Sequence, residues 1–562
     1  MKTGHPATFI AWRFYLLLFF IFLMIVGLVL RVVDLTIIKQ PFLKAQGDAR
    51  VIRSVEIPAF RGIITDRNGY PLAISASVFS VWINPKEFTY TSLYLTKLSH
   101  LLAVPSDKIQ SIVNHSKLKG REFTYLKRDV SPQIAKQIKS LKLPGLYLQP
   151  DYKRYYPEAE VAAHLVGFTN VDDEGQEGLE LAYNDWLKGK SGKKRVIKDR
   201  LGREISIVQA LREQKPGHDL VLSINRRIQY LAYRELVEGV ATNQAESGSI
   251  VVLDAKTGEI LAVTNWPSFN PNRFPSKRDN SFRNRALTDV FEPGSIIKAF
   301  SVASAIDSGR YKPDTVIDTA PGWMRVGHNL VKDEHNNHNL TVTQALQLSS
   351  NVGITKMILS LPPNQLWSLL HRVGFGEITG TSFPGERAGM LPRRTTWKPF
   401  TLATLAFGYG ISVTPLQLAQ AYGVLANNGM KIPLSLLRMD KPPVGEQVMD
   451  PTVAHQMLHL LEAVVSKGGT GERAHIPGYR VAGKTGTAEM VGIKGYQKQH
   501  NISSFVGIAP VTDPRLVVAV VIRDPQGKNH HGGFVAAPVF EKVMEGALLS
   551  LNIPPDDKVN AS

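Results

Sequence analysis

Three short motifs, far apart in the chain, carry side chains that together could transfer an acyl group. The first is an SxxK pattern formed by Ser295 and Lys298. A serine hydroxyl is a weak nucleophile until a neighbouring base takes its proton, and Lys298 is the candidate base. Ser295 follows a Pro-Gly pair and opens a segment with apolar residues at helical spacing. We therefore predict that it lies in the first turn of a buried helix, with Lys298 one turn later on the same face. The free N–H groups and positive dipole end of such a helix suit an oxyanion.

A lysine acts as a base only when its pKa falls well below the usual value. The reference pKa is about 10.4, and a fall of about 3, to near neutrality, corresponds to about 4 kcal/mol. Burial and a second nearby cation would both lower the pKa of Lys298. Ser295 taken alone would more often be a serine that starts a helix. SxxK also occurs at Ser116 and Ser191, in polar, basic or glycine-rich runs, so the pattern by itself identifies no site.

The second motif is SxN, formed by Ser349, Ser350 and Asn351 within QLSSNVG. The same tripeptide pattern recurs as what we interpret as turn or surface residues at Ser223, Ser268 and Ser550. SxN therefore carries weight only in combination with the other motifs.

The third motif is KTGT, formed by Lys484, Thr485, Gly486 and Thr487 within VAGKTGTAEM. Another KTG, at Lys256–Gly258, is interpreted as a hairpin turn and lacks the extra threonine. We predict that Lys484 ends a strand whose alternating pattern lays Thr485 and Thr487 along one edge, beside the site.

The same lysine also belongs to a phosphate-loop pattern. Gly478–Thr485 matches GxxxxGK[ST], and the apolar run Leu516–Ile522, ending near Asp524, imitates a magnesium-binding strand. A phosphate loop must lead from a strand directly into a helix whose N-terminus meets the phosphates. Gly486 and Gly492 interrupt any helix after Thr485, and the residues before the lysine alternate like a strand. Nucleotide hydrolysis is therefore disfavoured.

Other chemistries have weaker support. The chain has no Cys, which removes thiolate nucleophiles, CxxC redox chemistry and Cys-based zinc sites. His335 and His338 lie in DEHNNHN, which is more typical of a solvated loop than of a metal site. His530 and His531 precede two glycines and are interpreted as a turn that lines or flanks the cleft. We predict neither a metal nor a cofactor.

The elements that must position these motifs predict an α+β fold. Residues 249–254 and 259–263 are apolar runs around a turn and indicate a hairpin. Helical periodicity dominates from residue 295 to 465. Strand character returns at 479–487, 503–509 and 516–522, and an amphipathic helix follows near 538–549. This order predicts an antiparallel five-stranded sheet covered by helices.

The N-terminal part predicts a membrane anchor and a strand-rich module. Phe14–Leu30 is an uncharged apolar run long enough to cross a bilayer, and no small-residue cleavage site follows it. The region up to about residue 215 alternates strands and turns, as in RGIITDRNGYPLA (61–73), with a helix expected at 132–143. It contains no catalytic cluster and is interpreted as a spacer or docking module.

The chain of 562 residues has a formal charge of +18, which suggests a polyanionic neighbour: nucleic acid, anionic lipid headgroups or an acidic polymer. The densest basic run, Lys188–Arg203, has no interleaved aromatic residues for base stacking. We interpret it as a solvated strand-and-turn surface and predict no nucleic-acid partner.

The three motifs in this order resemble the penicillin-recognising serine acyltransferases. The strings around them, FEPGSIIKAF, SSNVG, FGYGISVTPLQLAQAYGVLANNG (Phe407–Gly429) and RGIITDRNGYPLA, are similar to class B penicillin-binding proteins, and within them to the division-specific D,D-transpeptidases. The resemblance covers nearly the whole chain. It implies a cytoplasmic tail (1–13), a transmembrane anchor (14–33), a pedestal or dimerisation-like domain (34–215), a transpeptidase domain (216–552) and a flexible tail (553–562).

The resemblance also implies roles for the site residues. Ser295 would attack the carbonyl of the penultimate D-Ala of a stem peptide, with Lys298 as general base and Ser349 as proton relay to the leaving amine. Asn351 would orient Lys298 and the substrate backbone, and Lys484 would be the second cation that lowers the pKa of Lys298. Thr485 and Thr487, around Gly486, would bind the terminal carboxylate. The oxyanion hole would be formed by the backbone N–H groups of Ser295 and Thr487.

The partners implied are peptidoglycan stem peptides or lipid-linked nascent glycan, β-lactams, and a membrane glycosyltransferase of the FtsW type with other divisome proteins. The location implied is the bacterial inner membrane, with a single span and a periplasmic catalytic domain. Septal synthesis is the leading hypothesis. The alternatives are an elongation-specific transpeptidase, or a β-lactamase or β-lactam sensor, which would share the nucleophile.

Overall fold

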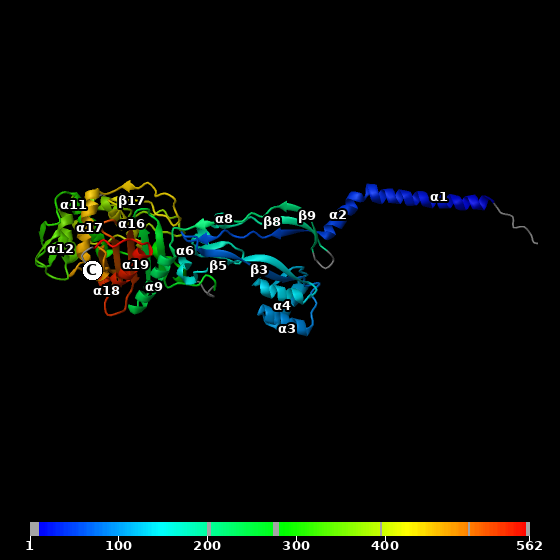
Figure 1. Cartoon of the computed structure of the whole chain (residues 1–562), viewed down its shortest axis with the longest axis horizontal. Coiled ribbons are helices and arrows are strands. Elements are labelled where there is room, and N and C mark those ends of the chain that lie inside the picture. The colour runs from blue at the N-terminus through cyan, green and yellow to red at the C-terminus, as the bar shows by residue number, and fades with distance from the viewer. Residues whose placement is uncertain (1–10, 199–203, 274–279, 394–395, 493–494, 558–562) are drawn as a thin grey trace, which may run out of the picture. The chain divides into compact units, whose positions relative to one another are not determined.

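The structure is a computed structural model that describes residues 11–198, 204–273, 280–393, 396–492 and 495–557 (Figure 1). The chain folds into two compact units that alternate along the sequence. The first is formed by Met1–Ala59, Ser77–Tyr152 and Gly189–Pro216, and the second by Phe60–Ala76, Lys153–Lys188 and Gly217–Ser562. The domain boundaries expected from the sequence stay predictions, and residues 1–10 of the expected N-terminal tail lie outside the described residues.

The N-terminal apolar segment is helical. α1 spans Ala11–Val33, drawn in dark blue in Figure 1, and none of its residues is buried. It runs directly into a π-helical turn, η1 (Asp34–Ile38), and α2 (Gln40–Val51) follows. By length and composition the helical stretch Ala11–Ile38 could cross a membrane, which is consistent with a single-pass anchor.

The rest of the first unit combines two small layers. One is an antiparallel sheet with β8 between β1 and β9. β8 contains Gly192–Lys198 of the basic run Lys188–Arg203, and residues 199–203 of that run lie outside the described residues. The other packs three helices on strand residues around a core of its own, and its helix α5 is the one expected from residue 132 onwards. These elements are β1 (Ile52–Ile57), β8 (Gly192–Lys198), β9 (Glu204–Arg212), β4 (Thr124–Val130), α3 (Ser92–Leu102), α4 (Ser106–Leu118) and α5 (Pro132–Ser140).

The centre of the second unit is the predicted five-stranded antiparallel sheet, in the order β12-β11-β21-β20-β19. The first two strands form the hairpin expected from the sequence. β19 lies at one edge and is therefore open to partners on one side. The bounds are β11 (Ser247–Asp254), β12 (Ile260–Trp266), β19 (Ala482–Gly492), β20 (Gly495–Ala509) and β21 (Leu516–Arg523).

Helices cover both faces of this sheet, which confirms the predicted architecture. Along β11, Val251 and Leu253 join one apolar core, while Ile250 and Val252 join the other. Because both faces are covered, the central strands are continuous apolar runs instead of alternating ones. The first face is covered by α11 (Lys298–Asp307), α16 (Pro415–Ala426) and α17 (Pro451–Val465), and the second by α9 (Arg226–Thr242) and α19 (Ala537–Ser550).

Shorter elements complete the second unit. Two small hairpin-like pairs, β14 with β15 and β13 with β16, lie in the sequence between α11 and α12. α16 begins with a Thr414–Gln417 capping box and a proline in its first turn, and it is buried along its whole length. The elements used below are β13 (Val316–Asp318), β14 (Trp323–Val326), β15 (Asn329–Lys332), β16 (Asn339–Thr341), α12 (Val342–Gln347), α13 (Asn351–Leu359), α15 (Pro399–Ala406) and α18 (Gly532–Val535).

A buried charge network ties together the N-terminal segments of the second unit. The Nε atoms of Arg61 and Arg154 lie 2.5 and 2.6 Å from the two carboxylate oxygens of Glu180, and the three side chains are at most 1% exposed. Arg61 also donates to the backbone carbonyl of Asp173 and to Asn184 Oδ1, both at 3.0 Å. Removing one member of such a network leaves a buried charge without its partner.

We expect Glu180→Gln to destabilise the second unit by about 3–5 kcal/mol, because two buried guanidinium groups would lose their counter-charge. The thermal midpoint of the full-length protein in detergent, followed by circular dichroism, should fall by several degrees. Asp513→Asn is the matched control, since its ion pair with Lys256 is 44% and 71% exposed, and an exposed pair contributes at most about 1 kcal/mol. Equal shifts for the two variants would contradict this expectation.

The C-terminal tail is partly fixed, unlike the flexible tail predicted for 553–562. The backbone carbonyl of Ile553 accepts a bond from Tyr479 Oη at 2.7 Å, and Asp556 accepts one from the backbone N–H of Arg480, also at 2.7 Å. These bonds hold the tail against the segment that precedes β19. Residues 558–562 lie outside the described residues.

Candidate active site

Ser295 lies in a short turn that leads directly into α11. This turn, η4 (Gly294–Ile297), is a 3-10 helix, so Lys298 and not Ser295 begins the α-helix expected from the sequence. Tyr422 Oη donates to the carbonyl of Ile296 at 3.0 Å and so fixes the turn to α16. Gly294 has φ +55°, and a Cβ there would lie 3.0 Å from the carbonyl oxygen of Thr487. The turn that carries the serine therefore packs directly on the edge strand β19.

Lys298 is 1% exposed and bonds to Ser349. Its Nζ donates to the backbone carbonyl of Ser349 at 2.6 Å and contacts Ser349 Oγ at 3.1 Å. Burial lowers the pKa of Lys298 to about 7, against the opposing effect of the carboxylates of Asp333 and Glu334. A substantial share of Lys298 side chains is therefore neutral near pH 7, as a general base requires.

Ser349 is held in an unusual backbone conformation between α12 and α13. Its φ is +58°, in the left-handed region. Ser350 caps α13 by accepting a bond from Gly353 N at 2.9 Å, and it donates to Asp333 Oδ2 at 2.5 Å. Asp333 Oδ1 also accepts from Val352 N at 2.9 Å. Sequence reasoning missed Asp333, which fixes the start of α13 and so the position of the SxN motif.

Asn351 makes a hydrogen bond that the sequence analysis did not anticipate. Its Nδ2 donates to the carbonyl of Lys332, at the end of β15, at 2.8 Å. Among the residues that the structure describes, no hydrogen bond joins Asn351 to Lys298. Asn351 thus ties the SxN motif to the β14–β15 pair, and its role in orienting Lys298 stays a prediction.

Lys484, on β19, reaches the same serine hydroxyl. It is fully buried, and its Nζ lies 3.1 Å from Ser349 Oγ, 3.3 Å from the carbonyl of Thr485 and 3.4 Å from Thr485 Oγ1. One expectation was wrong: Lys484 is near the start of β19, which runs on to Gly492, and does not end a strand. The later residues of β19 pair with β20 in a more exposed ribbon, so they lack the apolar alternation by which the strand was located.

The two lysines form one coupled pair around Ser349 Oγ. Burial and the positive charge of Lys298 hold the pKa of Lys484 well below its usual range. The repulsion is mutual, so the two amines titrate as a coupled pair. The sequence analysis assigned the base to Lys298 and the charge to Lys484. Both amines contact the same hydroxyl, and the assignment of the two roles stays a prediction.

Gly486 and Thr487 complete the contact between β19 and the nucleophile turn. A Cβ at Gly486 would lie 2.8 Å from Ile296 Cγ1 and 3.0 Å from the carbonyl of Pro293, so only glycine allows this approach. Thr487 Oγ1 accepts a bond from the N–H of Gly532 at 3.0 Å, which ties it to the start of α18. Thr485 Oγ1 donates to Thr470 Oγ1 at 3.0 Å, another contact that sequence reasoning missed.

The rival interpretation of Lys484 fails on structure. Thr485 continues into β19 and no helix follows it, so the backbone cannot form a phosphate loop. His530 and His531 lie directly before α18, and Ser503 Oγ donates to the His530 carbonyl at 2.5 Å; their place beside the cleft stays a prediction. His531 Nδ1 lies 4.0 Å from Glu334 Oε1.

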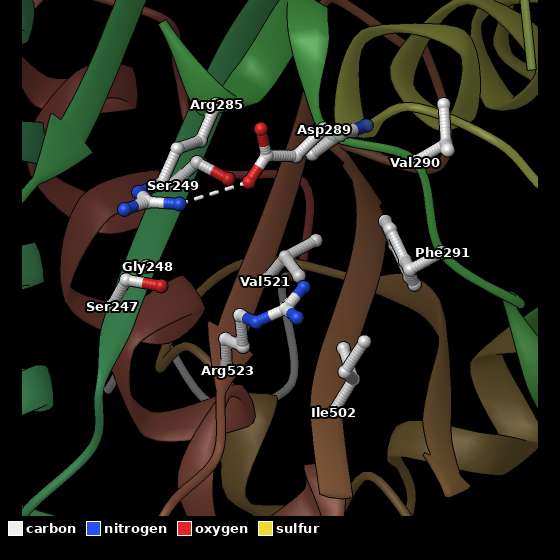
Figure 2. A pocket seen from close by; sticks show the side chains of 11 residues that line it. Ser247, Gly248, Ser249, Arg285, Asp289, Val290, Phe291, Ile502, Val521 and Arg523 are labelled. Atoms are coloured by element: carbon white, nitrogen blue, oxygen red, sulfur yellow. Dashed lines mark hydrogen bonds and ion pairs between the residues drawn. The ribbon is translucent and has the colours of Figure 1, made fainter. Parts of the chain in front are cut away.

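A separate small cavity lies near the start of β11 and the end of β21 (Figure 2). Arg285 Nη1 lies 2.9 Å from Asp289 Oδ2. Figure 2 shows this ion pair, with Arg523 below it. The cavity measures about 20 Å³, room for about one water molecule, and none of the eight predicted site residues lines it. It cannot hold a peptide substrate.

The arrangement around Ser349 therefore supports acyl transfer. A partly exposed serine opens a helix, a buried amine of lowered pKa lies one turn away, and a second buried amine and the open edge of a sheet face them. Among the described residues, no hydrogen bond holds the Ser295 hydroxyl, which is free to meet a carbonyl carbon. A substrate backbone could add to the edge of β19 as a further strand.

Comparisons with known proteins agree with this chemistry. The family described as "Penicillin binding protein transpeptidase domain" matches residues 248–545, and the "Penicillin-binding Protein dimerisation domain" matches residues 56–222. The peptidoglycan D,D-transpeptidase FtsI of Escherichia coli K12 is 43% identical over 99% of this chain and 95% of its own length.

Solved structures give the same result. Penicillin-binding protein 3 of Mycobacterium tuberculosis, solved with aztreonam, has a TM-score of 0.70 at 26% identity and covers 90% of this chain and 98% of its own. The transpeptidase domain of penicillin-binding protein 3 from Burkholderia pseudomallei has a TM-score of 0.56 at 39% identity over 60% of this chain and 98% of its own. With two matching family domains and a 43% identical relative along nearly its whole length, the chain belongs to the class B penicillin-binding proteins.

Proposed function

We propose that this protein is a peptidoglycan D,D-transpeptidase that crosslinks stem peptides through an acyl-enzyme on Ser295. The observation that carries the proposal is the convergence of Lys298 and Lys484 on the hydroxyl of Ser349, beside the turn that holds Ser295. The names of the relatives support the same activity.

The proposed reaction has two halves. Ser295 Oγ attacks the carbonyl carbon of the penultimate D-Ala while Lys298 takes the hydroxyl proton. The tetrahedral oxyanion accepts bonds from the N–H groups of Ser295 and Thr487, each typically worth about 3–4 kcal/mol of barrier. The C–N bond then breaks, and Ser349 relays the proton held by Lys298 to the departing amine of the terminal D-Ala. An amine from a neighbouring stem peptide attacks the ester carbonyl and gives a proton to Lys298. The C–O bond of the ester then breaks, the new amide forms, and the proton returns to Ser295.

The substrate carboxylate would bind at the KTGT strand. Thr485 and Thr487 lie two residues apart on β19 and so project to the same side of the strand. Lys484 places a further hydrogen-bond donor beside them, since its Nζ lies 3.4 Å from Thr485 Oγ1. We expect β-lactams, which carry a carboxylate and a reactive amide, to acylate the same serine.

The setting we propose is septal cell-wall synthesis at the inner membrane. α1 would be the single span, and the second unit would act in the periplasm. None of the proposed site residues lies in the dimerisation-type domain. The two families matched are a transpeptidase domain and a dimerisation domain, and neither is a glycan-polymerising domain. A glycosyltransferase of the FtsW type, with other divisome proteins, would supply the glycan strands.

The test is to incubate the full-length protein in detergent with a fluorescent penicillin, remove free drug and follow the label. A transpeptidase should keep the label over many minutes, because a persistent ester distinguishes it from an enzyme that hydrolyses penicillin. Intact-mass and peptide analysis should place one penicillin on Ser295. Rapid loss of the label would favour a β-lactamase, and a well-folded sample that never gains the mass would overturn the proposal.

A further inference from the structure

Thr470 joins the two walls of the proposed active site. It lies in the loop after α17 and carries an exposed side chain. Its backbone N–H and its Oγ1 both lie 3.3 Å from the carbonyl oxygen of Gln347, the last residue of α12, two residues before Ser349. On its other side, its Oγ1 accepts the bond from Thr485 of β19 at 3.0 Å. The residue thus connects the SxN segment to the KTGT strand.

The backbone of Thr470 is fixed independently of its hydroxyl. The backbone N–H keeps its own bond to Gln347. α18 packs against the other side, since a Cβ at Gly533 would lie 2.2 Å from the Thr470 carbonyl oxygen. The hydroxyl can therefore turn, or be removed, while the loop stays in place.

A chain of hydrogen bonds runs from Lys484 through the hydroxyls of Thr485 and Thr470 to the carbonyl of Gln347. Lys484 Nζ contacts Thr485 Oγ1 at 3.4 Å, Thr485 Oγ1 donates to Thr470 Oγ1, and Thr470 Oγ1 donates to the Gln347 carbonyl. A hydroxyl has one hydrogen. In this arrangement the hydrogen of Thr485 points to Thr470, so Thr485 offers a carboxylate no donor until the chain reverses.

We propose that Thr470 is a positioning residue that lets Thr485 present its hydrogen to the substrate carboxylate. When a carboxylate arrives, the Thr485 hydrogen turns to it, and the Thr470 hydroxyl turns to donate to Thr485 Oγ1. The Gln347 carbonyl keeps the N–H of Thr470, so reversal leaves it with a partner. No proton is transferred between atoms in this step, because the two hydroxyl groups only rotate about their C–O bonds. The inference rests on the proposed function, through the carboxylate role of Thr485.

The test compares a ligand that carries the carboxylate with one that does not. Full-length Thr470→Val keeps the β-branched shape and loses only the hydroxyl. With benzylpenicillin, we expect the second-order acylation rate constant to fall about fivefold, in line with the loss of one hydrogen bond. With benzylpenicillin methyl ester, the same constant should change by less than about twofold, because no carboxylate is there to bind. Thr470→Ser should restore the wild-type ratio of acid to ester.

Thr343→Val is the matched control. Thr343 also directs its N–H and Oγ1 to a single carbonyl, that of Pro313, at 3.1 and 2.9 Å, but within the described part of the chain no hydrogen bond joins its side chain to a site residue. It should leave both rates unchanged. Equal losses on acid and ester in Thr470→Val would make Thr470 a merely structural tether and overturn the inference, as would no loss on either. Absence of any adduct on the wild type would instead sink the proposed function on which the inference rests.

Discussion

Ser295→Ala is expected to abolish covalent labelling by penicillin, with a loss of at least about 10⁴-fold in acylation rate, because no other group can supply the attacking oxygen. The Ser295 hydroxyl has no hydrogen-bond partner among the described residues, so its removal should leave the free energy of unfolding within about 0.5 kcal/mol of the wild type. A lost adduct will therefore report lost chemistry and not lost folding. Stopped incubations read by intact mass give the rate, and thermal melts check the fold.

Ser191→Ala is the control for this variant. Ser191 opens another SxxK pattern but lies in the first unit, outside the proposed site. Its variant should label like the wild type. Retention of one penicillin per chain by Ser295→Ala would show that the nucleophile is another residue.

The sheet that positions this serine was predictable because the signals for its strands lie within the strand sequences themselves. The apolar runs at 249–254 and 516–522 are short, bounded by turn residues and rich in β-branched side chains, and both became central strands, β11 and β21. The helix after Ser295 was predictable for the same reason, since its apolar residues recur with the helical period. The low pKa of Lys298 followed, because a lysine within an apolar helix must be desolvated.

The parts that escaped prediction depend on contacts distant in sequence. Asp333 lies in a wholly polar run that is typical of a solvated loop. Its carboxylate nevertheless caps α13 through Ser350 and Val352, because the β14–β15 pair brings it back to the start of that helix. Thr470 likewise lies in a loop after the end of α17, and the sequence of this loop is like that of an ordinary surface loop. No local signal marks either residue.

Two glycines could have predicted the contact between the nucleophile turn and the KTGT strand. Gly294 and Gly486 both lie at points where η4 and β19 meet, and a side chain at either would collide with the other element. A glycine beside the functional residue in each of two motifs thus indicates that the backbones of the two segments approach each other closely. This close approach places the N–H groups of Ser295 and Thr487 on neighbouring segments, as an oxyanion hole formed by both would need.

The protonation state of the lysine pair gives the second large effect. Lys298 must be neutral to take the serine proton. Its pKa is about 7, so the neutral fraction, and with it the acylation rate, should rise about tenfold per pH unit below pH 7 and level off above it. Glu334→Gln should move this rise to lower pH, because the carboxylate of Glu334 raises the pKa of Lys298 and is itself 79% exposed.

Lys298→Met keeps the length of the side chain and removes the base. We expect acylation by penicillin to slow by about 10²–10⁴-fold and the rise centred near pH 7 to disappear, because the group whose loss of a proton produces that rise has been removed. Lys356→Met is the matched control: Lys356 Nζ also donates to a backbone carbonyl, that of Asp318 at 2.5 Å, but on α13 and away from Ser349. Its rate and pH profile should match the wild type. A Lys298→Met enzyme that retained the pH-dependent rise would assign the base to Lys484, the other member of the pair, whose pKa is also lowered by burial.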